Sequence, residues 1–373
     1  MEEPRRIVLV LGNGFDLDLG LKTSYKDFWE SEYCPKDYPA PLVAHLNQRW
    51  PDNLDAVKWY DLENELLNYY RGLSDPERGV DIISSEEKEL LKEFSSYGYQ
   101  CGWYNDKLEL LQSLVNKGVL QYRQDPLPRM LEHYKEDALQ SPIWRDRKAL
   151  NLIKEGLCKY LQSICGDSFA QDTVALNVLF ATNCARESGN SLSIYTFNYT
   201  PIPVIYSDDF QNVIHYVHGE CKKGNIIIGT RDDGEYVNSY DFLQKSFDSH
   251  FNSSPLVADL LEADEVVIFG HSIGENDRQY FKAFFKQQTD FERPLRKGIT
   301  IFTWDENSEV EIKRSLQKMT DNNLSTLYGL NQVDIIKTSR IKDNPNRLFS
   351  FFSKFIKDEM QVRVIMNQLL SAK

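Results

Sequence analysis

The sequence predicts an α/β protein with an open, doubly wound, mostly parallel sheet and a large all-helical insertion after the first strand–helix unit. Residues 7–11 form an apolar run without polar alternation, which is typical of a strand buried on both faces of a parallel sheet. From residue 191 onward, short apolar strand patterns alternate with helical patterns, as expected for a sheet wound from strand–helix units.

The segment after the first strand has mainly helical periodicity. Helical patterns occupy residues 23–29, 61–70, 108–120 and 148–164. Ser84 and Glu87 form a capping box ahead of a further helix. A loop is expected around residues 124–128, which contain two prolines.

Strand patterns return after residue 190. They lie at residues 192–197, 213–217, 226–229, 265–269, 299–304 and 333–336. Helical patterns at residues 276–288 and 308–322 separate some of them. We therefore expect a discontinuous α/β domain of residues 1–34 and 191–373, interrupted by a helical insertion of residues 35–190.

Composition excludes several classes of protein. The 373 residues include 43 Lys+Arg and 56 Asp+Glu, a net charge of −13, which disfavours a broad nucleic-acid-binding face. A hydrophobic fraction of 41% is enough for a sizeable core. Neither a membrane-spanning apolar run nor a signal-peptide pattern is evident, so we expect a soluble cytoplasmic protein.

The six cysteines are scattered and include no Cys-x-x-Cys pair. Zinc ribbons and redox dithiols depend on such close pairs, so we expect six ordinary thiols and no metal ligands.

Four predicted strands end in polar, turn-forming segments: residues 12–16, 196–200, 215–220 and 270–273. In an open parallel sheet, ligands bind beyond the carboxyl ends of the strands. We therefore expect these four segments to converge on one crevice.

The segment after the first strand has two interpretations. Gly12 and Gly14 would let the backbone approach a phosphate closely, or they simply form a tight turn. The third glycine of a dinucleotide fingerprint is replaced by Leu17. Asp16 either caps the next helix or faces a ribose.

Asn198 and His218 are the candidate catalytic residues. Asn198 is a turn residue or an amide that fixes a sugar hydroxyl or a water molecule. His218 is part of the hydrogen-bonded scaffold or transfers a proton near neutral pH, and Gly219 would let a ligand approach. His215, three residues earlier, is predicted to point to the opposite face of the strand.

Two further residues and one turn follow the same logic. His271 and Asp277 are ligand contacts or a pair at a helix start. Residues 232–234 are expected to form a turn.

Six segments together resemble the bacteriophage abortive-infection AbiH family. In chain order they are residues 12–16, 21–25, 59–63, 197–200, 218–219 and 270–273. A more distant similarity links the chain to sirtuins and to sirtuin-like NADases of phage defence. Their first motif has glycines spaced as Gly12, Gly14 and Gly20, and their Asn and His-Gly motifs align with Asn198 and with residues 218–219.

This resemblance implies a Rossmann-like, sirtuin-like sheet, catalytic roles for Asn198 and His218, and NAD as substrate or ligand without a prosthetic group or zinc. The implied binding residues are Gly12, Asn13, Gly14, Phe15, Asp16, Thr23, Ser24, Thr200, Gly219, Gly270, His271, Ser272 and Asp277.

The chain also departs from the sirtuin pattern. Sirtuins usually carry Ser where Asp16 stands, Arg near Tyr25, and Asp where Thr200 stands. Their four-cysteine zinc module is absent from the sequence. These departures disfavour protein deacylation.

Three functions remain open. The first is an antiphage effector, an NAD glycohydrolase (NADase) that cleaves the nicotinamide–ribose bond of NAD or of a related nucleotide. The second is a nucleotide- or phage-signal-binding module without turnover that acts through a partner protein. The third is a metal-dependent phosphodiesterase or nuclease that uses acidic groups such as Asp16, Asp61, Glu63 and Asp277. A homo-oligomer, the phage trigger and the role of the insertion are left open.

Overall fold

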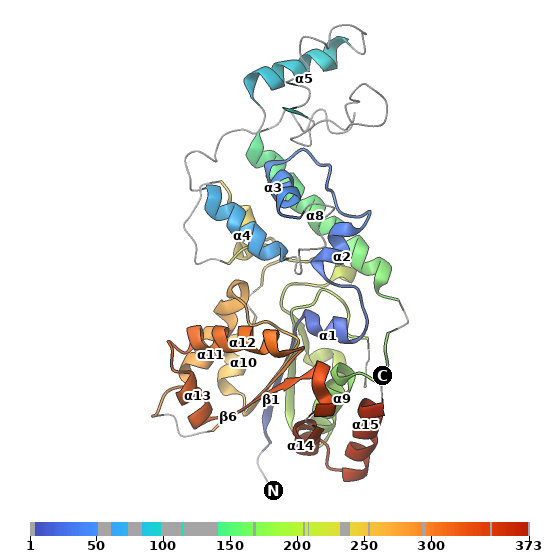
Figure 1. Ribbon diagram of the computed structural model, residues 1–373, viewed down its shortest axis with the longest axis vertical. Helices are drawn as coiled ribbons and strands as arrows, with labels where there is room; N and C mark the ends of the chain where they lie inside the picture. Colours follow the sequence, from blue (N-terminus) through green and yellow to red (C-terminus); the bar gives the residue numbers. More distant parts are fainter. Residues whose placement is uncertain are drawn as a thin grey trace. The chain divides into compact units, whose positions relative to one another are not determined.

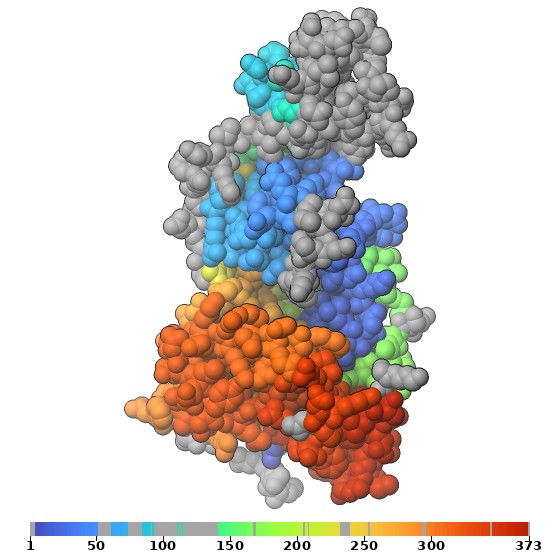
Figure 2. Space-filling model, in the orientation of Figure 1, coloured from blue at the N-terminus to red at the C-terminus, as the bar shows by residue number. Residues whose placement is uncertain are grey.

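The computed structural model describes most of the chain, and Figure 2 colours the described part. It comprises residues 4–50, 61–73, 84–97, 110, 113–114, 141–166, 169–203, 206–207, 209–231, 239–252, 254–292, 296–343 and 345–371. The predicted loop at 124–128, the predicted turn at 232–234 and most of the predicted helix at 108–120 lie outside these ranges.

The chain divides into two compact units. The sheet unit comprises Met1–Ser24, Leu161–Ile226 and Asn252–Lys373, and the helical unit comprises Tyr25–Tyr160 and Ile227–Phe251. This division differs from the predicted boundaries in three places. Residues 25–34, predicted as part of the sheet domain, belong to the helical unit. Residues 161–190 belong to the sheet unit, because their helix packs on the sheet. Residues 227–251 belong to the helical unit, where Lys245 pairs with Glu63.

The sheet unit is built on six parallel strands in the order β3-β2-β1-β4-β5-β6. The strands are β1 (Arg6–Leu11), β2 (Ser191–Thr196), β3 (Ile214–Tyr216), β4 (Glu265–Phe269), β5 (Gly298–Thr303) and β6 (Gln332–Lys337). Leu9 of β1 lies opposite Ile194 on one side and Val267 on the other. The prediction of a Rossmann-like α/β fold is confirmed, and the strand order reverses between β1 and β4.

One predicted strand is wrong. Residues 226–229 form no strand, and Thr230, the next residue, makes an isolated bridge with Gln244. Ile226, Ile227 and Ile228 are nevertheless buried. A short apolar run indicates burial, and periodicity alone cannot tell a strand from a buried irregular segment.

The helices follow most of the predicted patterns. In the helical unit they are α2 (Tyr25–Glu30), α3 (Pro41–Arg49), α4 (Leu62–Leu73), α5 (Ser85–Tyr97) and most of α8 (Pro142–Ile164). In the sheet unit they are α1 (Asn13–Asp18), α9 (Val174–Glu187), α10 (Leu256–Glu262), α11 (Arg278–Gln287), α12 (Glu306–Met319), α13 (Leu324–Leu330), α14 (Pro345–Phe355) and α15 (Glu359–Ser371). The predicted capping box is confirmed, because Ser84 and Glu87 each accept the other's backbone N–H.

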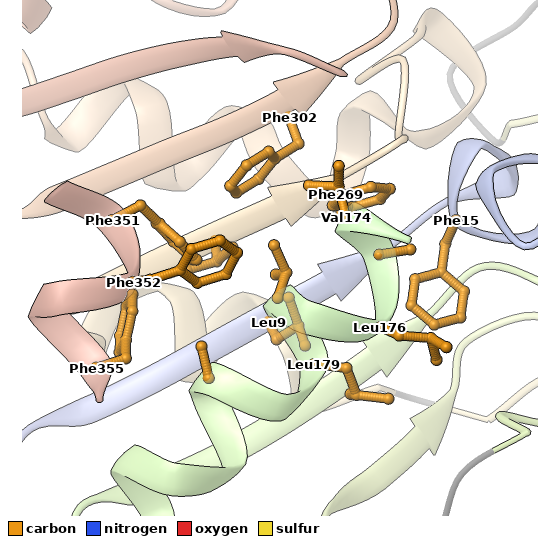
Figure 3. Packing of buried hydrophobic residues seen from close by; sticks show 14 of the residues in the cluster. Leu9, Phe15, Val174, Leu176, Leu179, Phe269, Phe302, Phe351, Phe352 and Phe355 are labelled. Carbon is orange, nitrogen blue, oxygen red and sulfur yellow. The ribbon is translucent and has the colours of Figure 1, made fainter. Parts of the chain in front are cut away.

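Helices cover both faces of the sheet (Figure 1). Leu9 points to the face covered by α9, α14 and α15, where Phe302 and Phe351 pack with it (Figure 3). Val8 and Val10 point to the other face, against α10, α11 and α12. This alternation explains the unbroken apolar run of β1, because residues 7–11 are all buried, on one face of the sheet or the other.

The turns after β1 and β4 touch at the centre of the sheet. Gly12 N–H donates to the Phe269 carbonyl and Gly14 N–H donates to the Gly270 carbonyl, both at 2.9 Å. A Cβ on Gly14 would lie 2.5 Å from the Gly270 Cα, and Gly270 itself has φ +63°. Only glycine fits at such a contact without backbone movement.

We expect Gly14→Ala to lower the free energy of unfolding by about 1–3 kcal/mol, because the new methyl group overlaps backbone that side-chain motion cannot relieve. Gly329→Ala in α13 is the matched control, since its Cβ meets nothing within 4 Å. That substitution should be neutral or stabilising by up to about 1 kcal/mol. Urea denaturation measures both; equal effects at the two positions would contradict the close-contact argument.

Candidate functional site

Asp16 is buried on α1 and faces the loop after β2. Its Oδ1 accepts a hydrogen bond from Asn198 Nδ2 at 3.0 Å, and its Oδ2 accepts one from Thr200 Oγ1 at 2.5 Å. Gly12 is the N-cap residue of α1, and no side chain caps that helix. Asp16 therefore ties the start of α1 to the loop after β2. It does not cap α1, and a contact with a ribose stays a prediction.

The Asn198 amide is held in one orientation. Nδ2 donates to the Gly12 carbonyl and to Asp16 Oδ1, both at 3.0 Å. Both acceptors are oxygens, so the amide nitrogen must lie on this side. Within the described part of the chain, Asn198 Oδ1 receives no donor, which leaves it as an acceptor for a further group.

Burial raises the pKa of the Asp16 carboxyl to about 7, against the opposing hydrogen bonds from Thr200 and Asn198. The ionised form loses its hydration in this interior, and two donors do not fully replace it. A substantial fraction of Asp16 is therefore neutral near physiological pH.

Asp277 lies between two buried histidines. Its Oδ1 is 3.5 Å from His218 Nε2 and its Oδ2 is 3.4 Å from His271 Nε2. The histidine side chains are each 5% exposed and that of Asp277 is 16% exposed. Asp277 ends the short helix η7 (Glu275–Asp277), directly before α11. His271 and Asp277 thus form a direct pair near the start of α11, and Asp277 also lies close to His218. A contact of these residues with a ligand stays a prediction.

Phe197 connects this cluster with the amide site. The centroid of its ring lies 5.2 Å from that of the His218 ring and 4.3 Å from that of the His271 ring, and both contacts are edge-on. Because Phe197 directly precedes Asn198, both histidines lie beside the loop that carries the amide. Its aromatic type was visible in the sequence, but its neighbours were not.

The turn after β4 is strained and positions His271. Ile273 is fully buried at φ +51°, a conformation that β-branched residues rarely adopt. Its N–H donates to His271 Nδ1 at 2.9 Å. In the neutral imidazole the proton must then be on Nε2, the nitrogen that faces Asp277.

The remaining predicted binding residues have diverse surroundings. Asn13 accepts a hydrogen bond from Thr23 Oγ1 at 2.7 Å, and Phe15 packs edge-on against Phe269 in the core (Figure 3). Gly219 has φ +80°. Ser272 is exposed, and Ser24 directly precedes α2.

His215 has different neighbours from His218. Its ring stacks on the Tyr195 ring with centroids 4.9 Å apart, whereas the His218 ring contacts Phe197. His215 is therefore a natural comparison residue for His218.

The acidic residues Asp61 and Glu63 lie in the helical unit and already have partners. Asp61 accepts the Asn64 N–H at the start of α4. Glu63 accepts a hydrogen bond from Lys245 Nζ at 2.8 Å, in a buried ion pair. In the residues with defined positions, no group of three or more His, Cys, Asp and Glu is arranged to hold a metal ion.

The fold and site together define a Rossmann-like α/β protein whose polar residues gather where the strand order reverses, the usual ligand position in such sheets. The family model described as bacteriophage abortive infection AbiH matches residues 8–295. The chain belongs to the AbiH family, which indicates a role in phage abortive infection. The predicted AbiH resemblance is confirmed, and the more distant similarity to sirtuins stays a prediction.

The comparison with curated proteins and that with solved structures give no match. Of the helices with defined positions, none combines the length and apolar character needed to cross a membrane.

We expect the stability of the wild type to fall between about pH 4 and about pH 7, and to fall less in Asp16→Asn. Asp16 has an ordinary pKa of 3.8 and a folded-state pKa of about 7, so only the folded state keeps its proton in this interval. Because the folded state holds this one extra proton, its free energy of unfolding falls by up to about 1.4 kcal/mol for each unit by which the pH rises.

Urea denaturation at several pH values, with the exposed Asp290→Asn as control, measures this difference. Parallel stability curves for the wild type and Asp16→Asn would show that the pKa of Asp16 is not raised.

Proposed function

We propose that this AbiH-family protein is an abortive-infection effector that hydrolyses the nicotinamide–ribose bond of NAD or of a related nucleotide. The observation that carries the proposal is the Asn198 amide, fixed through Nδ2 by Gly12 and Asp16 so that Oδ1 remains available. Such an acceptor at the carboxyl ends of β1 and β2 suits a ribose hydroxyl or the attacking water.

His218 is the proposed general base. Asp277 is within 3.5 Å of its Nε2, and Phe197 packs on its ring. A carboxylate that orients an imidazole is a common arrangement in general-base catalysis. His271 holds the opposite side of Asp277, which limits the movement of that carboxylate.

In the proposed reaction the bond between ribose C1′ and the nicotinamide nitrogen breaks, and its electron pair stays on the nitrogen. Nicotinamide leaves as a neutral ring. Water adds its oxygen to the cationic C1′ centre and gives one proton to His218. The products are nicotinamide and the rest of the dinucleotide, which now carries a hydroxyl group on ribose C1′. The proton on His218 later returns to solvent.

The Asp16–Thr200 pair supports the proposal. A carboxylate after β1 would repel a pyrophosphate if it faced the ligand, but Asp16 is occupied by Asn198 and Thr200. Sirtuins usually place hydroxyl and carboxyl at these two positions in the opposite order. In this chain the carboxyl group is at Asp16 and the hydroxyl group is at Thr200. The exchange would preserve a hydroxyl–carboxyl pair beside the Asn198 amide.

The proposed binding residues are those that the resemblance implies, with one constraint. The N–H groups of Gly12 and Gly14 already bond to the turn after β4, so these two glycines bring the turns together. A direct phosphate contact of either glycine stays a prediction. We also propose a cytoplasmic protein that acts on a small nucleotide and not on nucleic acid.

We expect purified protein to consume NAD, with nicotinamide as a product. His218→Ala should lower turnover by about 10²–10⁴-fold, because it removes the base. Asn198→Ala should lower turnover by about 10²-fold, because it removes the positioning acceptor. His215→Ala, which changes a histidine stacked on Tyr195, should stay within about threefold of wild type.

Mass spectrometry of the nucleotides provides the readout. Undiminished turnover in the Asn198→Ala and His218→Ala double variant would refute these assignments. A nucleotide that binds tightly and stays intact would favour the binding module. Turnover that EDTA abolishes would favour the metal-dependent phosphodiesterase.

Asp277→Asn should lower kcat by about 10–10²-fold with a smaller change in KM, because an amide orients the imidazole without stabilising its protonated form. Glu275→Gln is the matched control on the same turn, since Glu275 pairs with Lys318 at the surface. Steady-state kinetics and melting temperatures measure the outcome. Equal losses in both variants, or a loss confined to KM, would contradict the positioning role.

A further inference from the structure

A cavity of about 260 Å³ lies at the carboxyl end of the edge strand β6. Its walls come from the end of β6, the short helical segment η8 (Thr338–Asp343), the first residue of α12 and the start of α14. None of its lining residues belongs to the candidate site described above. Pockets for drug-sized ligands usually measure about 300–1,000 Å³, so this cavity suits a smaller molecule.

Hydrogen bonds hold the walls of the cavity together. The Ser339 N–H donates to the Trp304 carbonyl at 3.0 Å, which joins η8 to the end of β5. On α14, Arg347 Nη1 donates to the Ile335 carbonyl at 3.2 Å, which joins that helix to β6. The segments around the cavity are therefore fixed to the carboxyl ends of the last two strands.

Charges of both signs line the cavity. They are the cations Lys337, Arg340 and Arg347 and the carboxylates Glu306 and Asp343. Three further charged residues pair with this set from outside the lining: Glu309, Asp334 and Lys313. Together these are four cations and four carboxylates, so their charges balance. A ligand with a net charge would upset this balance, whereas a zwitterion preserves it.

The charged groups keep hydrogen-bonding capacity for a ligand. A guanidinium has five N–H donors, and within the described residues Arg347 gives one to the Ile335 carbonyl. Asp343 Oδ2 lies 3.9 Å from Arg340 Nε, beyond hydrogen-bonding distance. The side chains of Arg340, Arg347, Glu306 and Asp343 are between 46% and 68% exposed. Ion pairs at this exposure add little stability, so a ligand can replace them.

Aliphatic side chains complete the lining of the cavity. They are Ile335, Ile336, Ile341 and Leu348. An apolar group of a ligand that covers them leaves water, which favours binding. The cavity therefore suits a molecule that carries two opposite charges and a short apolar group.

We propose that this cavity binds a free α-amino acid with an apolar side chain. The ligand carboxylate pairs with Arg347 and Arg340, because a guanidinium can hold a carboxylate through two parallel hydrogen bonds. The ligand ammonium pairs with Glu306 and Asp343, and the ligand side chain covers the aliphatic residues. Binding here does not require NAD hydrolysis, since the cavity and the candidate site share no residue.

Isothermal titration calorimetry of the full-length protein with L-leucine and L-phenylalanine tests this site. We expect saturable binding of at least one of them, with a Kd of about 10 μM to 1 mM. Analogues without the ammonium group (4-methylpentanoate, 3-phenylpropanoate) should bind at least about tenfold more weakly than the parent amino acid. Analogues without the carboxylate (3-methylbutylamine, 2-phenylethylamine) should be weakened to a similar extent, because each leaves one set of charges unmatched.

Variants locate the bound amino acid. Arg347→Met should weaken binding at least about tenfold, because it removes the guanidinium and keeps the apolar chain. Glu306→Gln should weaken binding about three- to tenfold, because the ammonium loses a carboxylate partner. Arg314→Gln is the matched control, since Arg314 is an exposed residue of α12 that pairs with Glu311 and does not line the cavity. Its Kd should equal that of the wild type, and melting temperatures show that each variant is folded.

Several results would overturn the proposal. One is the lack of saturable binding by both amino acids, and another is an analogue that binds as tightly as its parent. Unchanged affinity in Glu306→Gln would place the ligand elsewhere, and this variant decides the matter even if Arg347→Met fails to fold.

Discussion

The contact between the turns after β1 and β4 is the constraint on which the candidate site depends. Gly14 and Gly270 approach so closely that backbone meets backbone, and two N–H···O bonds join the turns. This joint sets where α1 begins, and with it the position of Asp16. It also starts the turn that ends in the strained Ile273 and holds His271. The positions of Asp16 and of His271 thus both depend on this one backbone contact.

Asp16, Asn198 and Thr200 hydrogen-bond to one another, but burying the Asp16 carboxyl costs free energy of folding. Burying the Asp16 carboxyl is unfavourable, and its raised pKa expresses the part that Asn198 and Thr200 do not compensate. The hydrogen bonds of Asn198 Nδ2 to Gly12 and Asp16 also fix the orientation of the Asn198 amide. The cluster around Asp277 follows a similar principle, with one carboxylate holding two imidazoles beside Phe197. A site of this kind favours precise placement of groups over maximal stability.

Several parts of this architecture were predictable and others were not. The unbroken apolar run of β1 indicated a strand covered on both faces, and the core residues Leu9 and Val10 confirm it. The same reasoning produced a false strand at residues 226–229, because burial and ladder pairing leave the same short apolar pattern.

The sequence by itself determined the class of fold, the strand ends at which polar residues gather, and membership of the AbiH family. These properties follow from local composition and period, which each segment carries alone. Only the tertiary structure decided that Asp16 bonds to Asn198 and Thr200, that Asp277 joins His218 to His271, and that the glycine N–H groups bond to a neighbouring turn. The physical reason is that a hydrogen bond depends on distance and direction in space, and the fold brings together loops that lie far apart along the chain.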